Sequence, residues 1–196
     1  MIEENFKNLK EEEIKDIVSY IINYIQRDPG DRDKGRSSNI EIAIGCDSVN
    51  KKRRTIFNIT IVFYDRMLHK GAHIIYKTVY EKRIRDLHTK LWREVEYVRE
   101  LGEFLDEKLK DFYYIEHSKN RYDDSTPYRL PILHIDINPF AGNGKNKSNS
   151  IYHGSMGYLC SYGYKSEAKP YSYASNHAAD FLCRRKRRRK LSDIIE

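Results

Sequence analysis

The chain has 196 residues and a net charge of +7, and 33% of its residues are charged. A chain of this length can bury a substantial core as one domain, so we expect a single domain over 1–183 and a basic tail over 184–196. Its cysteines are spaced for neither a disulfide framework nor a zinc site. No apolar run approaches the ~20 residues that cross a bilayer, and the acidic N-terminus is unlike a signal peptide. We therefore expect a cytoplasmic protein with no membrane partner.

The positive charge is concentrated near the C-terminus. The run RRKRRRK carries seven positive charges, equal to the whole net charge of +7, so the rest of the chain is balanced. Such a block attracts polyanions. The candidate nucleic-acid-binding residues are Arg184, Arg185, Lys186, Arg187, Arg188, Arg189 and Lys190. The alternative is a solvated tail or a targeting patch.

The first half of the chain predicts one helix and three strands. Isoleucines at helical spacing behind an acidic first turn predict an amphipathic helix from Glu11 to Gln26. Period-two apolar residues and short polar turns predict strands from Ile40 to Asn50, Thr55 to Tyr64 and Gly71 to Lys82. Three consecutive strands with short connections form an antiparallel meander.

The first of these strands ends in an acidic turn at Asp47, followed by Ser48. A carboxylate at the end of a rigid strand is well placed to hold a metal ion. The alternative is that Asp47 only forms the turn.

A long helix is predicted from Asp86 to about Lys110, with an apolar stripe of Leu and Val residues. At about 100° per residue, Glu94 and Asp106 border this stripe, whereas Glu96 and its other acidic neighbours point away. Glu94 is thus either a functional acid or the ordinary margin of an amphipathic helix.

After the long helix, the polar stretch from Tyr113 to Arg129 predicts an irregular connection. The apolar run from Leu130 to Ile137 predicts a central strand that carries Asp136 near its end. If this strand is a parallel neighbour of the strand from Ile40, Asp47 and Asp136 lie side by side.

The remaining segments predict a loop, two helices and a short strand. The loop from Pro139 to Ser150 lacks the G-x-x-x-x-G-K-[ST] spacing, so no nucleotide P-loop is expected. A helix should follow to Tyr162 with Gly163 as its C-cap, then a strand from Tyr164 to Ala168. A last helix from Ser172 to Arg185 carries Asp180, which is either functional or an ordinary solvent-facing acid.

The blocks IAIGCDS, LWREVEYV, LHIDI and AKPYSYASNHAAD resemble the YkuK-type family of ribonuclease H-like proteins. The resemblance extends from the N-terminal helix to about Leu182. It implies an α/β ribonuclease H-like fold with a mixed five-stranded sheet, built of an antiparallel three-strand meander plus two parallel strands and flanked by helices. The family commonly has a threonine where this chain has Cys46.

The resemblance also implies a set of carboxylates that are both catalytic and metal-binding: Asp47, Glu94, Asp136 and Asp180. The expected cofactor is a pair of Mg²⁺ or Mn²⁺ ions about 4 Å apart, because two such ions stabilise both the attacking and the leaving oxygen of a phosphodiester. Asp47 would bridge both ions. Supporting or alternative residues are Ser48, His177 and Lys169, with His177 able to take the place of Asp180.

The expected function is therefore two-metal hydrolysis of phosphodiester bonds in RNA, RNA/DNA hybrid or structured or single-stranded DNA. Four crowded carboxylates repel one another without cations, so their presence favours a metal enzyme. Fold alone does not decide function. The alternatives are a nucleic-acid-binding module that does not cleave and an interaction protein whose basic tail is a docking signal.

Overall fold

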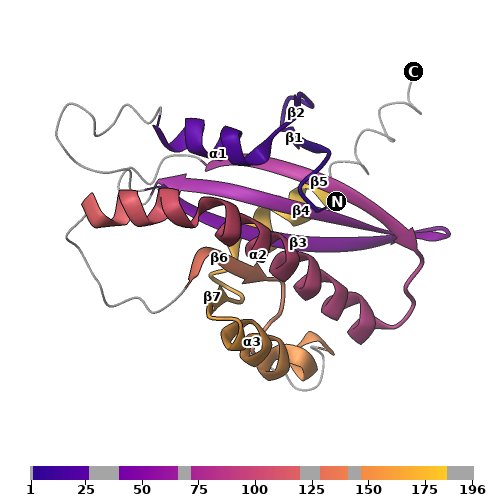
Figure 1. The fold of residues 1–196 in the computed structure, drawn as a ribbon. Helices are drawn as coiled ribbons and strands as arrows, with labels where there is room; N and C mark the ends of the chain where they lie inside the picture. The colour runs from indigo at the N-terminus through magenta and orange to yellow at the C-terminus, as the bar shows by residue number, and fades with distance from the viewer. Residues whose placement is uncertain (1, 27–39, 66–71, 120–128, 141–146, 185–196) are drawn as a thin grey trace.

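The computed structural model describes residues 2–26, 40–65, 72–119, 129–140 and 147–184. Seven strands form one mixed sheet in the order β2-β1-β5-β4-β3-β6-β7 (Figure 1). The main hydrophobic core joins one face of this sheet to the apolar sides of α1, α2 and α3. A smaller cluster joins the other face to the last helical segment, η3 (Ala174–Ala179). The mixed α/β architecture expected from the sequence is confirmed.

The N-terminal region differs from the prediction of one helix from Glu11. Two short strands, β1 (Phe6–Asn8) and β2 (Glu13–Ile14), come first, and α1 (Ile17–Gln26) begins only after them. Asp16 sets this start, because its Oδ1 accepts the N–H of Val18 at 3.0 Å and caps the first turn. β1 pairs with β5, so the five expected strands are extended to seven.

The antiparallel meander is present as expected. Its strands are β3 (Ile40–Lys51), β4 (Arg54–Asp65) and β5 (Ala72–Lys82), each paired to the next along nearly its whole length. The β3–β4 connection is a two-residue turn in which Lys52 has a φ of 44°. These long strands project beyond the shorter β6 and β7 (Figure 1).

Helix α2 (Leu87–Lys119) packs against β3 and β6. Its predicted stripe is confirmed, since the following side chains are all buried: Leu91, Val95, Val98, Leu101, Leu105 and Leu109. The helix is longer than expected and covers the first part of the stretch that we predicted to be irregular. The rest of that stretch, residues 120–128, lies outside the described residues.

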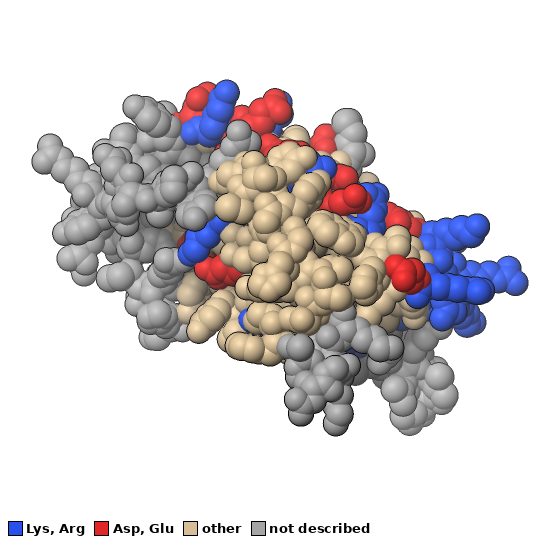
Figure 2. Space-filling model, turned by 90° about the horizontal axis from the view of Figure 1, so that it is seen from below, with Lys and Arg blue, Asp and Glu red and all other residues tan. Residues whose placement is uncertain are grey.

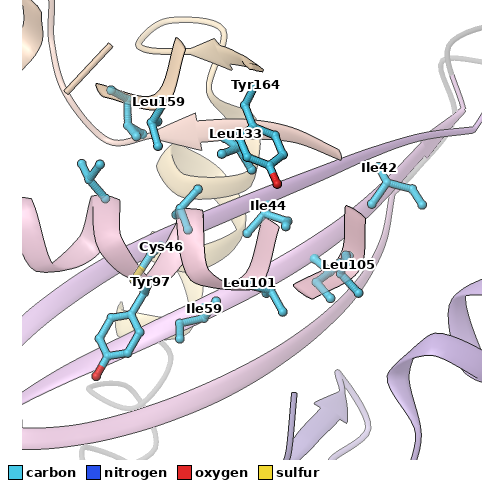
Figure 3. Close-up of a cluster of buried hydrophobic side chains, with 14 of the residues drawn as sticks. Ile42, Ile44, Cys46, Ile59, Tyr97, Leu101, Leu105, Leu133, Leu159 and Tyr164 are labelled. Carbon is cyan, nitrogen blue, oxygen red and sulfur yellow. The ribbon is translucent and has the colours of Figure 1, made fainter. Parts of the chain in front are cut away.

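The second half supplies the two parallel strands, β6 (Arg129–Ile135) beside β3 and β7 (Tyr164–Glu167) beside β6. Between them lie η2 (Lys147–Ile151) and α3 (Tyr152–Ser161), and Gly163 follows with a φ of 83°, the left-handed conformation of a helix C-cap glycine. Leu133 of β6 and Tyr164 of β7 lie in the core with residues of α2 and β3 (Figure 3). No helix in the described ranges combines the length and apolar content needed to cross a bilayer.

The last helix contains a feature that its sequence pattern did not predict. Its first part, η3, is a π-helix, and it contacts β3 at Gly45. A Cβ at Gly45 would lie 2.3 Å from the backbone carbonyl carbon of Ala174 and 2.3 Å from the backbone nitrogen of Ser175. Only glycine therefore allows the helix to lie this close to the strand.

Candidate metal centre

Two of the predicted acids lie beside each other on neighbouring parallel strands. β3 continues to Lys51, so the expectation that this strand ends in an acidic turn at Asp47 is wrong, whereas Asp136 directly follows β6. The last registered pair of β3 and β6 is Cys46 with Ile135, and Asp47 and Asp136 each come one residue later. The prediction that these two strands are parallel neighbours is confirmed. Because parallel strands run in the same direction, both carboxylates stand at the same position along the sheet.

Glu94 reaches this edge from α2. Its side chain is only 5% exposed, and it accepts a hydrogen bond from Ser48 Oγ at 2.5 Å. The neighbouring acids Glu96 and Glu100 have side chains that are 45% and 37% exposed. The helical-face prediction that separated Glu94 from these acids is confirmed by the burial.

Asp180 comes to the site from the other face of the sheet. It stands at the end of η3, and its Oδ1 pairs with Arg184 Nε at 2.8 Å. One turn later, the Cys183 thiol lies 3.7 Å from the carbonyl oxygen of Asp47 and accepts a hydrogen bond from Asn58 Nδ2 at 2.9 Å. The last helix is thereby held against the end of the Asp47 strand.

The four carboxylates interact electrostatically. Burial raises the pKa of Asp47 to about 6, and the charges of Asp136 and Asp180 add to this shift, while hydrogen bonds from Cys183 and from the Ser48 N–H oppose it. Burial likewise raises the pKa of Glu94 well above its usual value, with further contributions from Asp47 and Asp136. Like charges brought together in this way favour protonation or a bound cation.

Asp136 has a cationic partner of its own. Lys169 Nζ lies 2.6 Å from Asp136 Oδ1, yet this oxygen has no hydrogen bond of good geometry. We treat the contact as an ion pair, because the distance is short and the directional criterion matters less for charges. A buried carboxylate oxygen without a directed donor is a suitable ligand for a hard divalent cation.

The carboxylate oxygens are the type of donor that such a cation prefers, but the side chains do not converge on one point. As the side chains stand, no group of three or more His, Cys, Asp and Glu residues in the described part of the chain is gathered tightly enough to hold a metal ion. Ser48, Lys169 and Arg184 each hold one of the four acids. Metal binding would therefore require small side-chain movements that replace these partners.

The structure distinguishes the other candidate residues by whether they contact the acids of the site. Ser48 and Lys169 contact Glu94 and Asp136 directly. His177 is exposed, and the charge felt by Asp47 from this helix is that of Asp180. Of the predicted basic block, Arg184 pairs with Asp180, and the remaining residues, 185–190, lie outside the described part of the chain.

Sequence reasoning did not find the residues that position the last helix. His134 of β6 is fully buried, and its Nδ1 accepts the N–H of Ala174 at 3.1 Å. The other ring nitrogen, Nε2, faces Glu167 Oε2 at 3.4 Å, a long contact. Hydrogen bonding from His134 is the main cause that lowers the pKa of Glu167 to about 2. The only sequence signal was a histidine inside an apolar strand.

A five-strand core of antiparallel meander and two parallel strands, with one acid in the first strand and one directly after the fourth, defines a ribonuclease H type of α/β protein. The model of the Ribonuclease H-like family matches residues 16–184, and the chain belongs to this family. Neither the curated proteins nor the solved structures gave a match.

Proposed function

We propose that the protein is a divalent-metal-dependent nuclease. The observation that carries this proposal is the proximity of Asp47, Glu94, Asp136 and Asp180, which come from separate elements and whose negative charges help to raise the pKa of Asp47 and of Glu94. A protein gains nothing in stability from bringing like charges together at partly buried positions. Such a cluster is explained by a cation that offsets their repulsion.

Each acid would contribute from a fixed position. Asp47 and Asp136 are positioned by rigid parallel strands. Asp47 interacts electrostatically with each of the other three acids, so it would be suited to hold both metal ions. Glu94 is oriented by Ser48, and Asp180 by the helix that His134 and Gly45 hold in place. Two Mg²⁺ or Mn²⁺ ions, when bound, supply an activated water and stabilise the leaving oxygen.

Lys169 has a role in the metal-free protein and during binding. Its ion pair with Asp136 offsets one negative charge of the cluster. With Asp136 holding a cation, Lys169 would be free to contact a phosphate oxygen of the substrate beside the site. The substrate class, a nucleic acid, is proposed from the ribonuclease H-like family; RNA, RNA/DNA hybrid and DNA all remain candidates.

One observation favours a second candidate, a module that binds nucleic acid without cleaving it. Lys169 Nζ lies 2.6 Å from Asp136 Oδ1, so the lysine occupies the carboxylate oxygen that a metal ion would need as a ligand. If Lys169 stays on Asp136, only part of the acid set is free for metal, and binding without hydrolysis results.

A metal and substrate matrix tests the two candidates. Purified protein with Mg²⁺, with Mn²⁺ or with a chelator is incubated with end-labelled RNA, RNA/DNA hybrid, single-stranded DNA and a DNA junction. The proposal expects metal-dependent cleavage of at least one substrate by the wild type and none by Asp47→Asn. Tight binding without cleavage of any substrate in either metal would favour the second candidate and refute the first.

A further inference from the structure

The face of the meander that carries Asp47 also carries two further rows of side chains toward the β3–β4 turn. Residues two apart on a strand share a face, so the registered pairs of the three strands define these rows. The rows, from the site outward, are Asp47, Asn58 and Thr78, then Val49, Ile56 and Tyr80, then Lys51, Arg54 and Lys82. Asp47, Tyr80 and the three cations therefore share one face of the sheet, on which Asn58 and Ile56 are buried while Tyr80 and most of the basic end are exposed.

This surface is the face opposite α2. Ser48 and Phe57, which alternate with the residues of the rows, instead contact Glu94 and Tyr97 of that helix. The last helix lies on the same face as the rows. It meets Gly45 and Thr60, and its Cys183 covers part of the first row by contacting Asn58 and the carbonyl of Asp47. At the basic end, Arg54, Tyr80 and Lys82 are exposed, and Tyr80 has a relative exposure of 53%.

The distance from the acidic row to the basic row follows from strand geometry. Four residues separate Asp47 from Lys51, which is about 14 Å at the rise of a β-strand. The strands that carry the outer row are about 5 Å apart, which is the spacing of neighbouring strands, so Lys51, Arg54 and Lys82 extend from three adjacent backbones. A stacked nucleic-acid strand advances about 3.4 Å per nucleotide, so about four nucleotides would span the distance between these two rows.

The basic row is part of a larger positive end of the molecule. Lys52, Arg53, Arg83 and Arg85 are also exposed there. The Arg83 N–H donates to the Arg53 carbonyl at 3.1 Å, which fastens the end of β5 to the β3–β4 turn. Figure 2 shows Lys and Arg side chains gathered at one end of the molecule, where Figure 1 places this turn.

The acidic residues beside these cations are used elsewhere. Glu81 points to the α2 face, where Arg93 Nε pairs with it at 2.9 Å. Asp86 Oδ2 accepts the N–H of Thr89 at 2.7 Å and caps α2. Within the part of the chain that the structure describes, Glu81 and Asp86 are therefore paired with other groups than the cations of this positive end.

The turn itself carries a lysine in a conformation that lysine disfavours. Lys52 has a φ of 44°, the left-handed region that glycine and asparagine adopt at the least cost in two-residue hairpins. A charged side chain at this position adds positive charge at the expense of backbone strain.

We propose that the exposed basic end of this sheet face binds a single-stranded segment of nucleic acid close to the carboxylate site, an inference that rests on the proposed function and names its substrate class. Lys51, Arg54 and Lys82 contact backbone phosphates, and the ring of Tyr80 stacks on a base. An unpaired strand fits best because only unpaired bases expose a face for stacking on an aromatic side chain.

The first experiment measures binding in a chelator, so that it does not depend on cleavage. Fluorescence anisotropy compares a labelled single-stranded oligothymidylate with a blunt duplex for wild type and for Lys51→Ser/Arg54→Ser/Lys82→Ser. Each phosphate contact on a single strand contributes about −0.7 to the slope of log K against log salt, so losing three should flatten the slope by about 2. The matched control neutralises three exposed lysines on other elements, Lys10, Lys15 and Lys110.

The outcomes separate the possibilities. A flatter slope in the row variant with an unchanged slope in the control supports the proposal. An unchanged slope in the row variant, an equal change in both variants, or a preference for the blunt duplex would overturn it. Because no metal is present, these results hold whether or not the protein cleaves. Failure of the proposed binding surface can therefore be distinguished from failure of the nuclease proposal.

Two single substitutions test the individual roles. Tyr80→Leu should weaken single-strand binding about five- to a hundredfold, the range for losing one stacked base, while Tyr80→Phe keeps the ring and should restore it. Lys52→Gly should weaken binding and yet raise the melting temperature, because it removes both the charge and the backbone strain. Loss of binding in Tyr80→Phe equal to that in Tyr80→Leu, or unchanged binding in Lys52→Gly, contradicts the assignment.

Discussion

Replacing Asp47 by Asn should make the metal-free protein more stable at neutral and alkaline pH, although it removes a carboxylate of the proposed metal site. Burial and the charge of Asp136 raise the pKa of Asp47 from 3.8 to about 6. Between these two values the folded protein keeps a proton that the unfolded chain has released. The free energy of unfolding therefore falls as the pH rises through about 6.

The size of this effect follows from the shift. At 1.36 kcal/mol per pKa unit, the full contribution of Asp47 is about 3 kcal/mol, present at low pH and lost above the folded-state pKa. Integrating the two titration curves places about 1.4 kcal/mol of this loss between about pH 5 and about pH 8. Asn cannot ionise, so the stability of Asp47→Asn lacks this loss.

The assay is urea unfolding of both proteins in a chelator at about pH 5 and about pH 8, where a difference of 1.4 kcal/mol is readily resolved. The stability of the variant relative to the wild type should increase by about that amount between the two pH values. Adding Mg²⁺ at the higher pH should stabilise the wild type and not the variant. A difference that does not change with pH, or a variant that is less stable at about pH 8, would refute the reasoning.

Three further predictions concern the surroundings of the site. Glu94→Gln should lower kcat on the order of a hundredfold, as expected for a lost metal ligand, whereas Glu96→Gln, on the exposed side of α2, should not change it. Gly45→Ala should destabilise the fold by at least about 1–3 kcal/mol in thermal unfolding, since its Cβ would meet the Ala174 backbone at 2.3 Å. Removing residues 185–196 should flatten the salt dependence of binding by roughly 3 to 4 if four phosphate contacts are lost, without changing kcat at saturation.

Each of these three has an outcome that contradicts it. Equal loss of activity in the two glutamine variants would mean that the α2 register does not decide which acid takes part. A Gly45→Ala protein with wild-type stability would mean that the last helix can move away from β3 at no cost. An unchanged salt slope after truncation would exclude the tail from the nucleic-acid site.

The elements with a long, regular apolar pattern were predictable from the sequence. The stripe of α2 and the alternation in β3, β4 and β5 each gave the element and its buried face. The short strands β1 and β2, of three and two residues, have no period to detect. The π-helix η3 was also missed, because its alanine-rich sequence fits α and π spacing equally well.

The clustering of positive charges at one end of the sheet could not be predicted from the sequence. Lys51 to Arg54 and Lys82 to Arg85 are separated by the whole of β4 and β5, and only the strand register brings them together. A count of charges outside the tail came to zero and concealed this gathering. A neutral total over a domain says nothing of how its charges are placed.

The carboxylate site was predictable in part because β3 and β6 are parallel. Parallel pairing with Cys46 opposite Ile135 places the next residue of each strand side by side, so Asp47 and Asp136 must approach each other. Asp180 had no such constraint, because its place depends on how closely η3 approaches Gly45 and on the bond from Ala174 to the buried His134. The position of Asp180 therefore depends on the absence of a side chain at Gly45 and on the buried imidazole of His134. Both act through tertiary packing, which the spacing of residues in the sequence does not reveal.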